Sequence, residues 1–227
     1  MRRKNTNSGR RSAVITGVLL LTGLVTGIFS VVPVIDGADY LVQASTNGNQ
    51  VLIGAFSQLL MVAAYVGIPI ALYPILSKHN KGLALGSAAF GIISGVFVII
   101  GVIILLLLLT LSHEFAKVGT MNGSYFQTLG GLLREGRDLV NHVATTLTSV
   151  LAMFLFNCIF YQAKFIPRWL SVSGLIGSIL SILASLLFMI RFIGLDATYM
   201  TLNVPIASQQ LILAIWLLLK GFNRADY

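Results

Sequence analysis

The chain has 227 residues and a net charge of +8, but 56% of its residues are hydrophobic and only 10% are charged. Ordinary soluble domains carry roughly 25% charged residues, so this composition cannot cover a water-facing surface and excludes a soluble fold. A transmembrane helix needs about 20 apolar residues, and a chain of this length is filled by six such spans with short connections. We therefore predict an all-α, polytopic integral membrane protein: a bundle of six transmembrane helices with an outer amphipathic segment.

Six apolar stretches follow one another along the chain, and every Lys, Arg, Asp and Glu residue lies outside them. One charge at the bilayer centre costs about 2.5 kcal/mol or more, so this exclusion is a strong signal for membrane spans. The predicted spans are residues 13–34, 51–76, 82–111, 139–161, 170–190 and 202–219. They form one domain, 13–219, between a basic N-terminus (1–12) and a short C-terminus (220–227). A secretory signal peptide is the alternative for the first stretch, but its apolar run is too long, and we favour a retained span.

The basic residues are distributed unevenly over the connections, and this predicts the orientation of the chain. Eleven of the 15 Lys and Arg residues fall on the side of the N-terminus. The basic residues on the other side are Lys117, Arg134, Arg137 and Arg191. Of the acidic residues, only Asp226 shares the side of the N-terminus. We expect both termini to be cytoplasmic, and the positive charge to contact anionic lipid rather than nucleic acid.

The long outer segment, residues 112–138, contains apolar residues at helical spacing beside charged ones. Phe126, Leu129, Leu132 and Leu133 recur as on one face of a helix, which predicts an amphipathic helix lying on the outer face of the membrane. It is either a lid over an outward-facing cavity or an interfacial anchor leading into the fourth span. We favour the anchor.

The turn between the fourth and fifth spans resembles a known signature. It reads Tyr161, Gln162, Ala163, Lys164, Phe165, Ile166, Pro167, Arg168, Trp169, Leu170, with Gly174 and Gly177 after it. This run is similar to the "Y-x-x-x-[FY]-[IL]-P-R-W-L…G" pattern of a bacterial six-span family, the domain of unknown function four-three-eight-six. The segments around 72–85 and 213–221 also resemble that family. The resemblance implies the fold and a multi-pass location in the bacterial inner membrane, but no catalytic or binding role.

Small residues recur along several spans at the spacing that lets transmembrane helices approach closely. Gly-x-x-x-Gly pairs begin at Gly23, Gly82 and Gly91. In the fifth span a continuous small face is formed by Gly174, Ser178, Ser181 and Ser185. Their neighbours are helices of the same chain or of a second copy, so oligomerisation through these faces is open. We favour neighbours within the chain.

Uncharged polar residues inside the spans are the remaining functional clue. Gln58, Thr145, Thr148, Gln209 and Gln210 all lie roughly 10 Å below the predicted outer surface, at 1.5 Å per residue, and Tyr65 lies deeper. These six side chains are either the lining of an outward-facing polar pocket or hydrogen-bonding partners that hold the helices together. A charge-free cluster at this depth suits a neutral or amphipathic ligand.

The sequence shows no catalytic or cofactor motif, and its three histidines are scattered, so we expect no cofactor and no metal site. We hypothesise a non-enzymatic protein that binds or moves a small neutral or lipid-like molecule, with membrane lipids and that molecule as its partners. The alternative is an intramembrane enzyme or an accessory subunit of a larger membrane complex.

Overall fold

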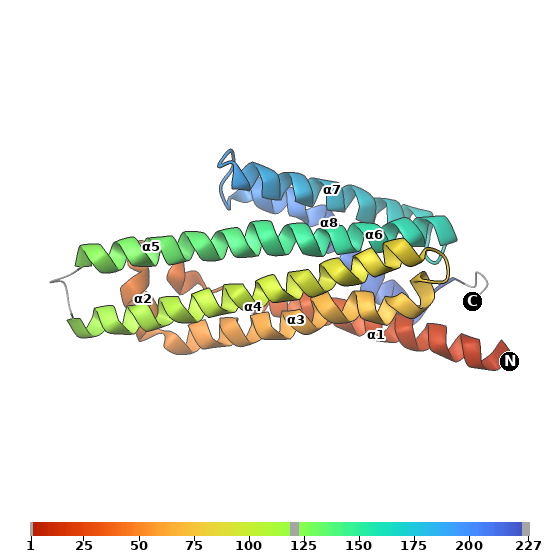
Figure 1. Ribbon diagram of the computed structural model, residues 1–227, viewed down its shortest axis with the longest axis horizontal. Helices are drawn as coiled ribbons and strands as arrows, with labels where there is room; N and C mark the ends of the chain where they lie inside the picture. Colours follow the sequence, from red (N-terminus) through yellow and green to blue (C-terminus); the bar gives the residue numbers. More distant parts are fainter. Residues whose placement is uncertain (1, 119–122, 224–227) are drawn as a thin grey trace.

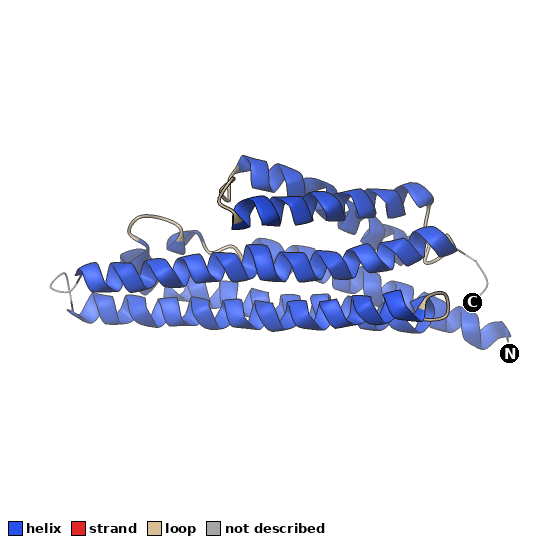
Figure 2. Ribbon diagram, turned by 45° about the horizontal axis from the view of Figure 1, so that its top comes forward, coloured by secondary structure: helices blue, strands red, loops and turns tan. Residues whose placement is uncertain are grey.

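The computed structural model describes residues 2–118 and 123–223, and the side chains from residue 9 onward within these ranges. The described residues form helices and turns without a strand (Figure 2). The elements are α1 (Arg2–Phe29), η1 (Pro33–Ile35), α2 (Tyr40–Thr46), α3 (Gly48–Leu76), α4 (Lys81–Val118), α5 (Gly123–Leu139), a π-helical turn (Val140–Thr145), α6 (Thr146–Ala163), α7 (Arg168–Met189) and α8 (Ala197–Leu219).

Six helical segments are long and apolar enough to cross a membrane, which confirms the predicted multi-pass fold. They are arranged as a ring. Along the ring α1 packs against α3, α3 against α4, α4 against α6, α6 against α7 and α7 against α8, and α8 closes the ring by packing against α1. The start of α1 and the last turn of α8 lie at the same end of the bundle (Figure 1). We call the opposite end, which carries α2, the end of α4 and the start of α5, the distal end.

The helix predicted on the outer face has a different orientation from the one expected. α5 does not lie flat but continues into α6 through the π-helical turn, so that residues 123–163 form one rod (Figure 1). At 1.5 Å per residue, this 41-residue rod is about 60 Å long, twice the thickness of a hydrocarbon core. Phe126 and Leu133 of α5 pack against a cluster that includes residues of α2 and α4, whereas Leu132 of the predicted apolar face is 68% exposed. Tyr40 of α2 donates a hydrogen bond to the Gln127 carbonyl at 3.1 Å. These protein contacts replace the membrane surface that the amphipathic pattern led us to expect.

Specific residues end and start the helices at the turns. The side chain of Asn80 accepts a hydrogen bond from the Leu83 backbone N–H at 3.0 Å, which caps the start of α4. Lys164 ends α6 in the left-handed conformation, and Pro167 precedes the first residue of α7. Asp196 accepts hydrogen bonds from the backbone N–H groups of Thr198 and Tyr199, which is the usual way to satisfy free donors at a helix start. The distal ends of α7 and α8 are therefore fixed to each other by a short capped turn.

Small residues let neighbouring helices of the chain approach closely. A Cβ added at Gly91 would come within 2.7 Å of the Tyr65 carbonyl, and one at Gly177 would come within 2.8 Å of the Ile206 backbone nitrogen. The serine face of α7 is also buried, and Ser181 donates a hydrogen bond to Asn203 of α8. Gly27 is different, because nothing described lies within 4 Å of its added Cβ. Oligomerisation through α1 stays a prediction.

Candidate functional site

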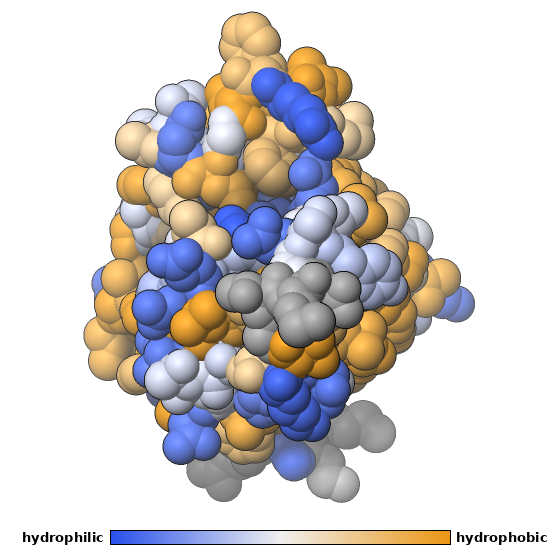
Figure 3. Space-filling view, turned by 90° about the vertical axis from the view of Figure 1, so that its left-hand side faces the viewer, coloured by the Kyte–Doolittle hydropathy of each residue, from blue (hydrophilic) through white to orange (hydrophobic). Residues whose placement is uncertain are grey.

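A cavity of about 660 Å³ lies at the distal end of the ring, between α3, α5, the π-helical turn and the α7–α8 turn. It forms where α7 and α8 end while the α5–α6 rod continues (Figure 1). Seen from the distal end, hydrophilic side chains spread over the middle of the face and hydrophobic ones flank it (Figure 3). We refer to this space as the distal cavity.

Eleven polar or charged side chains line the distal cavity, and six of them come from α5 and the π-helical turn. α3 contributes two more. The polar lining consists of Ser30, Asp36, Gln58, Tyr65, Arg134, Arg137, Asp138, Asn141, His142, Thr145 and Thr146. The remainder is apolar and includes Val98, Phe188 and Met200. The cavity is therefore amphipathic.

Arg137 is the most buried charged residue of this lining. Its exposed fraction is only 8%, and its one ion pair in the described structure joins Nη1 to Oδ1 of Asp138 at 3.5 Å, which is the outer limit of a hydrogen bond. Its Nε is buried and has no hydrogen-bond partner among the described residues. A guanidinium carries five N–H donors. Within the described structure, Nη1 is the atom of Arg137 with a protein hydrogen-bond partner, and the buried Nε has none.

Two more buried polar atoms of the lining have no partner within the described structure. They are Oε1 of Gln58, in α3, and Oγ1 of Thr145, in the π-helical turn. The Gln58 amide donates only a long hydrogen bond, 3.5 Å, to the Ser30 carbonyl. Leaving a buried polar group unpaired costs roughly 1–3 kcal/mol. Of the eight buried side-chain atoms without a partner in the described structure, three belong to the lining of this cavity, where a polar ligand or ordered water can be accommodated.

The π-helical turn positions three polar side chains of the cavity lining. Inserting one residue into a helix re-aims the side chains that follow, and such turns occur often at functional sites. Here the turn directs Asn141, His142 and Thr145 to the distal cavity. Tyr199 of α8 fixes the position of the His142 ring. The Nδ1 atom of His142 lies 3.3 Å from the Tyr199 hydroxyl, and the two rings meet edge to face.

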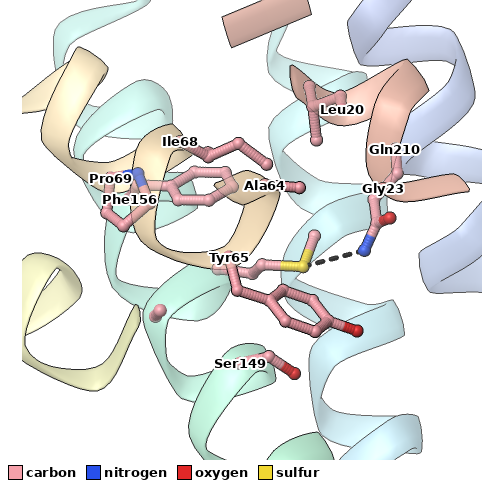
Figure 4. Close-up of a pocket in the computed structure, with 11 residues that line it drawn as sticks. Leu20, Gly23, Ala64, Tyr65, Ile68, Pro69, Ser149, Phe156 and Gln210 are labelled. Atoms are coloured by element: carbon pink, nitrogen blue, oxygen red, sulfur yellow. Dashed lines mark hydrogen bonds between the residues drawn. The ribbon is translucent and has the colours of Figure 1, made fainter. Parts of the chain in front are cut away.

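A second, smaller void of about 50 Å³ lies deeper in the ring, among mostly apolar side chains (Figure 4). Tyr65 lines both this void and the distal cavity, so it lies between them. Gln210 also lines the void, and its Nε2 lies 2.9 Å from the Met153 sulfur, the contact drawn as a dashed line in Figure 4.

The six residues singled out in the sequence do not all share one site. Gln58, Tyr65 and Thr145 line the distal cavity, whereas Gln210 lines the deeper void. Gln209 is buried elsewhere and donates a hydrogen bond to Asn157 at 3.3 Å. The Thr148 hydroxyl bonds to the Ala144 carbonyl of the preceding turn at 2.7 Å. The structure therefore does not bring Gln58, Thr148, Gln209 and Gln210 into one cluster.

The charged part of the site was missed in the sequence. Arg134, Arg137 and Asp138 lie in the outer segment 112–138, for which the sequence indicated no binding residue. The upright position of α5 (Figure 1) brings them to the cavity. A signal was available, since Arg137 and Asp138 come one helical turn before Asn141 and His142 on what proved to be a continuous helix. Among the described residues, no three His, Cys, Asp or Glu side chains are placed to hold a metal ion.

Comparison with known proteins gives one match. No curated protein and no solved structure matches the chain. One family model matches residues 15–221, which include most of the first membrane-spanning segment, the other five in full, and the lining of both cavities. The chain belongs to the family described as domain of unknown function DUF4386.

Proposed function

We propose that this chain is a binding or carrier protein of the bacterial inner membrane, which takes up a small net-neutral or lipid-like molecule in the distal cavity. Both termini would be cytoplasmic, as the distribution of basic residues favours. The distal cavity would then open toward the outer side of the membrane.

The observation that carries the proposal is the group of three unpartnered buried polar atoms, on Gln58, Arg137 and Thr145, around one cavity. The volume of about 660 Å³ lies within the range of small-molecule sites, which is roughly 300–1,000 Å³. A site for a small molecule is usually an apolar wall with a few convergent polar groups. The distal cavity has this composition.

The charges of the lining support a net-neutral ligand. The guanidinium groups of Arg134 and Arg137 are matched in number by the carboxylates of Asp36 and Asp138. A net charge on the ligand would be left without a counter-charge in a partly apolar site, which is costly. The apolar wall formed by Val98 and its neighbours suits a hydrocarbon part.

A pair of valines in α4 provides a matched test. Val98 lines the cavity and is 3% exposed, whereas Val96 is 51% exposed on the outside of the same helix. The purified protein is heated in detergent with three short-chain probes that share two hexanoyl tails: a diacylglycerol, a phosphatidylethanolamine and a phosphatidylglycerol. A ligand that binds only the folded state raises the unfolding temperature.

We expect at least one probe to stabilise the wild type and Val96→Trp, and to have little effect on Val98→Trp, because the indole fills the cavity. If no probe stabilises the wild type, or if Val98→Trp responds as Val96→Trp does, the proposal is wrong.

A further inference from the structure

Arg137 and Asp138 are neighbours in the chain, and both line the distal cavity, so a ligand there meets opposite charges side by side. Their ion pair is long, 3.5 Å, and a good charged hydrogen bond is closer to 2.7–2.9 Å. In the described structure neither charge is therefore neutralised well by the other. A ligand can improve the surroundings of both.

Arg137 is the anchor for an anionic group. Only 8% of its surface is exposed, and its Nε has no hydrogen-bond partner among the described residues. A carboxylate or phosphate can accept two parallel N–H bonds from a guanidinium, which is the geometry that Arg offers and Lys does not. Burial strengthens such a contact because water competes less.

The second arginine is less available. Arg134 donates to the backbone carbonyls of Asp36 and Gly37 at 3.0 and 3.2 Å, and its guanidinium lies 4.8 Å from the centre of the Tyr40 ring. It therefore holds the η1–α2 connection in place. Arg137 is therefore the principal side chain of the cavity that can donate hydrogen bonds to an anion.

An anion alone would be placed poorly at Arg137, since the carboxylate of Asp138 is beside it and that of Asp36 also lines the cavity. Both would repel a second negative charge. A cationic group on the same ligand removes this repulsion by meeting the carboxylates. The arrangement of charges thus favours a ligand that is net neutral but carries both signs.

We propose that the distal cavity recognises a zwitterionic group, with its phosphate or carboxylate on Arg137 and its ammonium on Asp138 and Asp36. This inference rests on the proposed function of the cavity and names its ligand class. The same chemistry occurs in the headgroup of a zwitterionic phospholipid and in a small soluble zwitterion.

The three hexanoyl probes test this, with O-phosphorylethanolamine as a tail-free probe. For the wild type we expect the phosphatidylethanolamine to bind at least tenfold more tightly than the diacylglycerol and the phosphatidylglycerol. Tight binding of O-phosphorylethanolamine alone would identify a soluble zwitterion, and binding that needs the tails would identify a lipid. Both results support the inference.

Three variants separate recognition from folding. Arg137→Gln should lose at least tenfold in affinity for the phosphatidylethanolamine. Arg191→Gln, which removes an exposed basic residue at the same end together with its exposed ion pair to Glu135, should keep the wild-type affinity, because surface ion pairs contribute little to stability. Asp138→Asn should bind the phosphatidylglycerol more tightly than the wild type does, a gain that misfolding cannot produce.

Equal affinity for the diacylglycerol and the phosphatidylethanolamine would overturn the zwitterion inference while leaving the proposed function intact. So would an unchanged ratio of phosphatidylglycerol to phosphatidylethanolamine affinity in Asp138→Asn. Failure of every probe on the wild type is the separate outcome that refutes the proposed function itself.

Discussion

Two adjacent glycines in α5 form a matched pair for testing the upright position of that helix. Gly130 faces α2, and a Cβ added there would come within 2.9 Å of Cε2 of Tyr40 and closer still to its hydroxyl oxygen. At Gly131 nothing described lies within 4 Å of an added Cβ. Replacing either glycine by alanine should favour the helix by about 0.5–1 kcal/mol. Only Gly130→Ala adds a steric conflict.

The size of that conflict follows from how Tyr40 is held. Its ring is 6% exposed and its hydroxyl bonds to the Gln127 carbonyl, so the ring cannot move without losing a hydrogen bond worth about 1 kcal/mol. Overpacking adds about 1–3 kcal/mol. The two variants should therefore differ by roughly 2–4 kcal/mol in the free energy of opening α5.

Amide hydrogen exchange measures this local opening directly. We expect exchange in α5 to be faster than wild type in Gly130→Ala by about fivefold or more, after the gain in helix propensity is subtracted, and equal or slower in Gly131→Ala. In a Tyr40→Phe background, which lacks the hydroxyl nearest to the new Cβ, Gly130→Ala should cost less. Identical exchange in the two alanine variants would refute the packing of α5 against α2.

Three further predictions concern packing, pH and orientation. Gly177→Ala should lower the unfolding temperature in detergent, because its Cβ would meet the α8 backbone at 2.8–2.9 Å, whereas Gly27→Ala should not; similar losses would contradict the close α7–α8 contact. Backbone hydrogen bonds from Tyr199 and Thr198 lower the pKa of Asp196. This cap therefore stabilises the fold above the unfolded pKa of about 3.9, and its contribution is lost as pH falls through the lower folded pKa. The stability gap between wild type and Asp196→Ala should be constant near neutral pH and should close in acid; a gap that persists at pH 2 would argue against the cap. In a chain otherwise free of cysteine, Gly37→Cys should react with a membrane-impermeant thiol reagent added outside intact cells, and Lys78→Cys only after permeabilisation; the reverse pattern would invert the proposed orientation.

The spans were predictable because lipid excludes charge, but the helix ends followed other rules. The apolar run of the third span stops at Leu111, while α4 continues to Val118, since a helix needs no apolar residues once it leaves the membrane. α8 begins at Ala197, five residues before its predicted span, because Asp196 caps it there. The outer amphipathic helix was identified, but its orientation depends on contacts with α2 and α4 that its own pattern does not contain.

For the candidate site, the sequence predicted how deep each residue lies in the membrane but not the direction in which its side chain points. Gln209 and Gln210 have nearly the same depth, yet successive helical residues point about 100° apart. One therefore meets Asn157 and the other the void beside Met153. Gln58, Tyr65 and Thr145 do share the distal cavity, but counting along the chain cannot distinguish them from Thr148. The charged lining was missed because it lies outside the predicted spans, where the sequence indicated no binding residue.

The closed ring has a consequence for how the protein is made. Of the described helices, α1 is synthesised first, and α8, which completes the packing of α1, is synthesised last. Arg10 then joins the two ends by donating hydrogen bonds to the Leu217 and Leu218 carbonyls. Until α8 has inserted, the inward faces of α1 and α7 are open to lipid or to the insertion machinery. Neither cavity has its complete wall before that moment, because α8 contributes Met200 to the distal cavity and Gln210 to the deeper void. The binding site that we propose is therefore complete only after α8 has inserted.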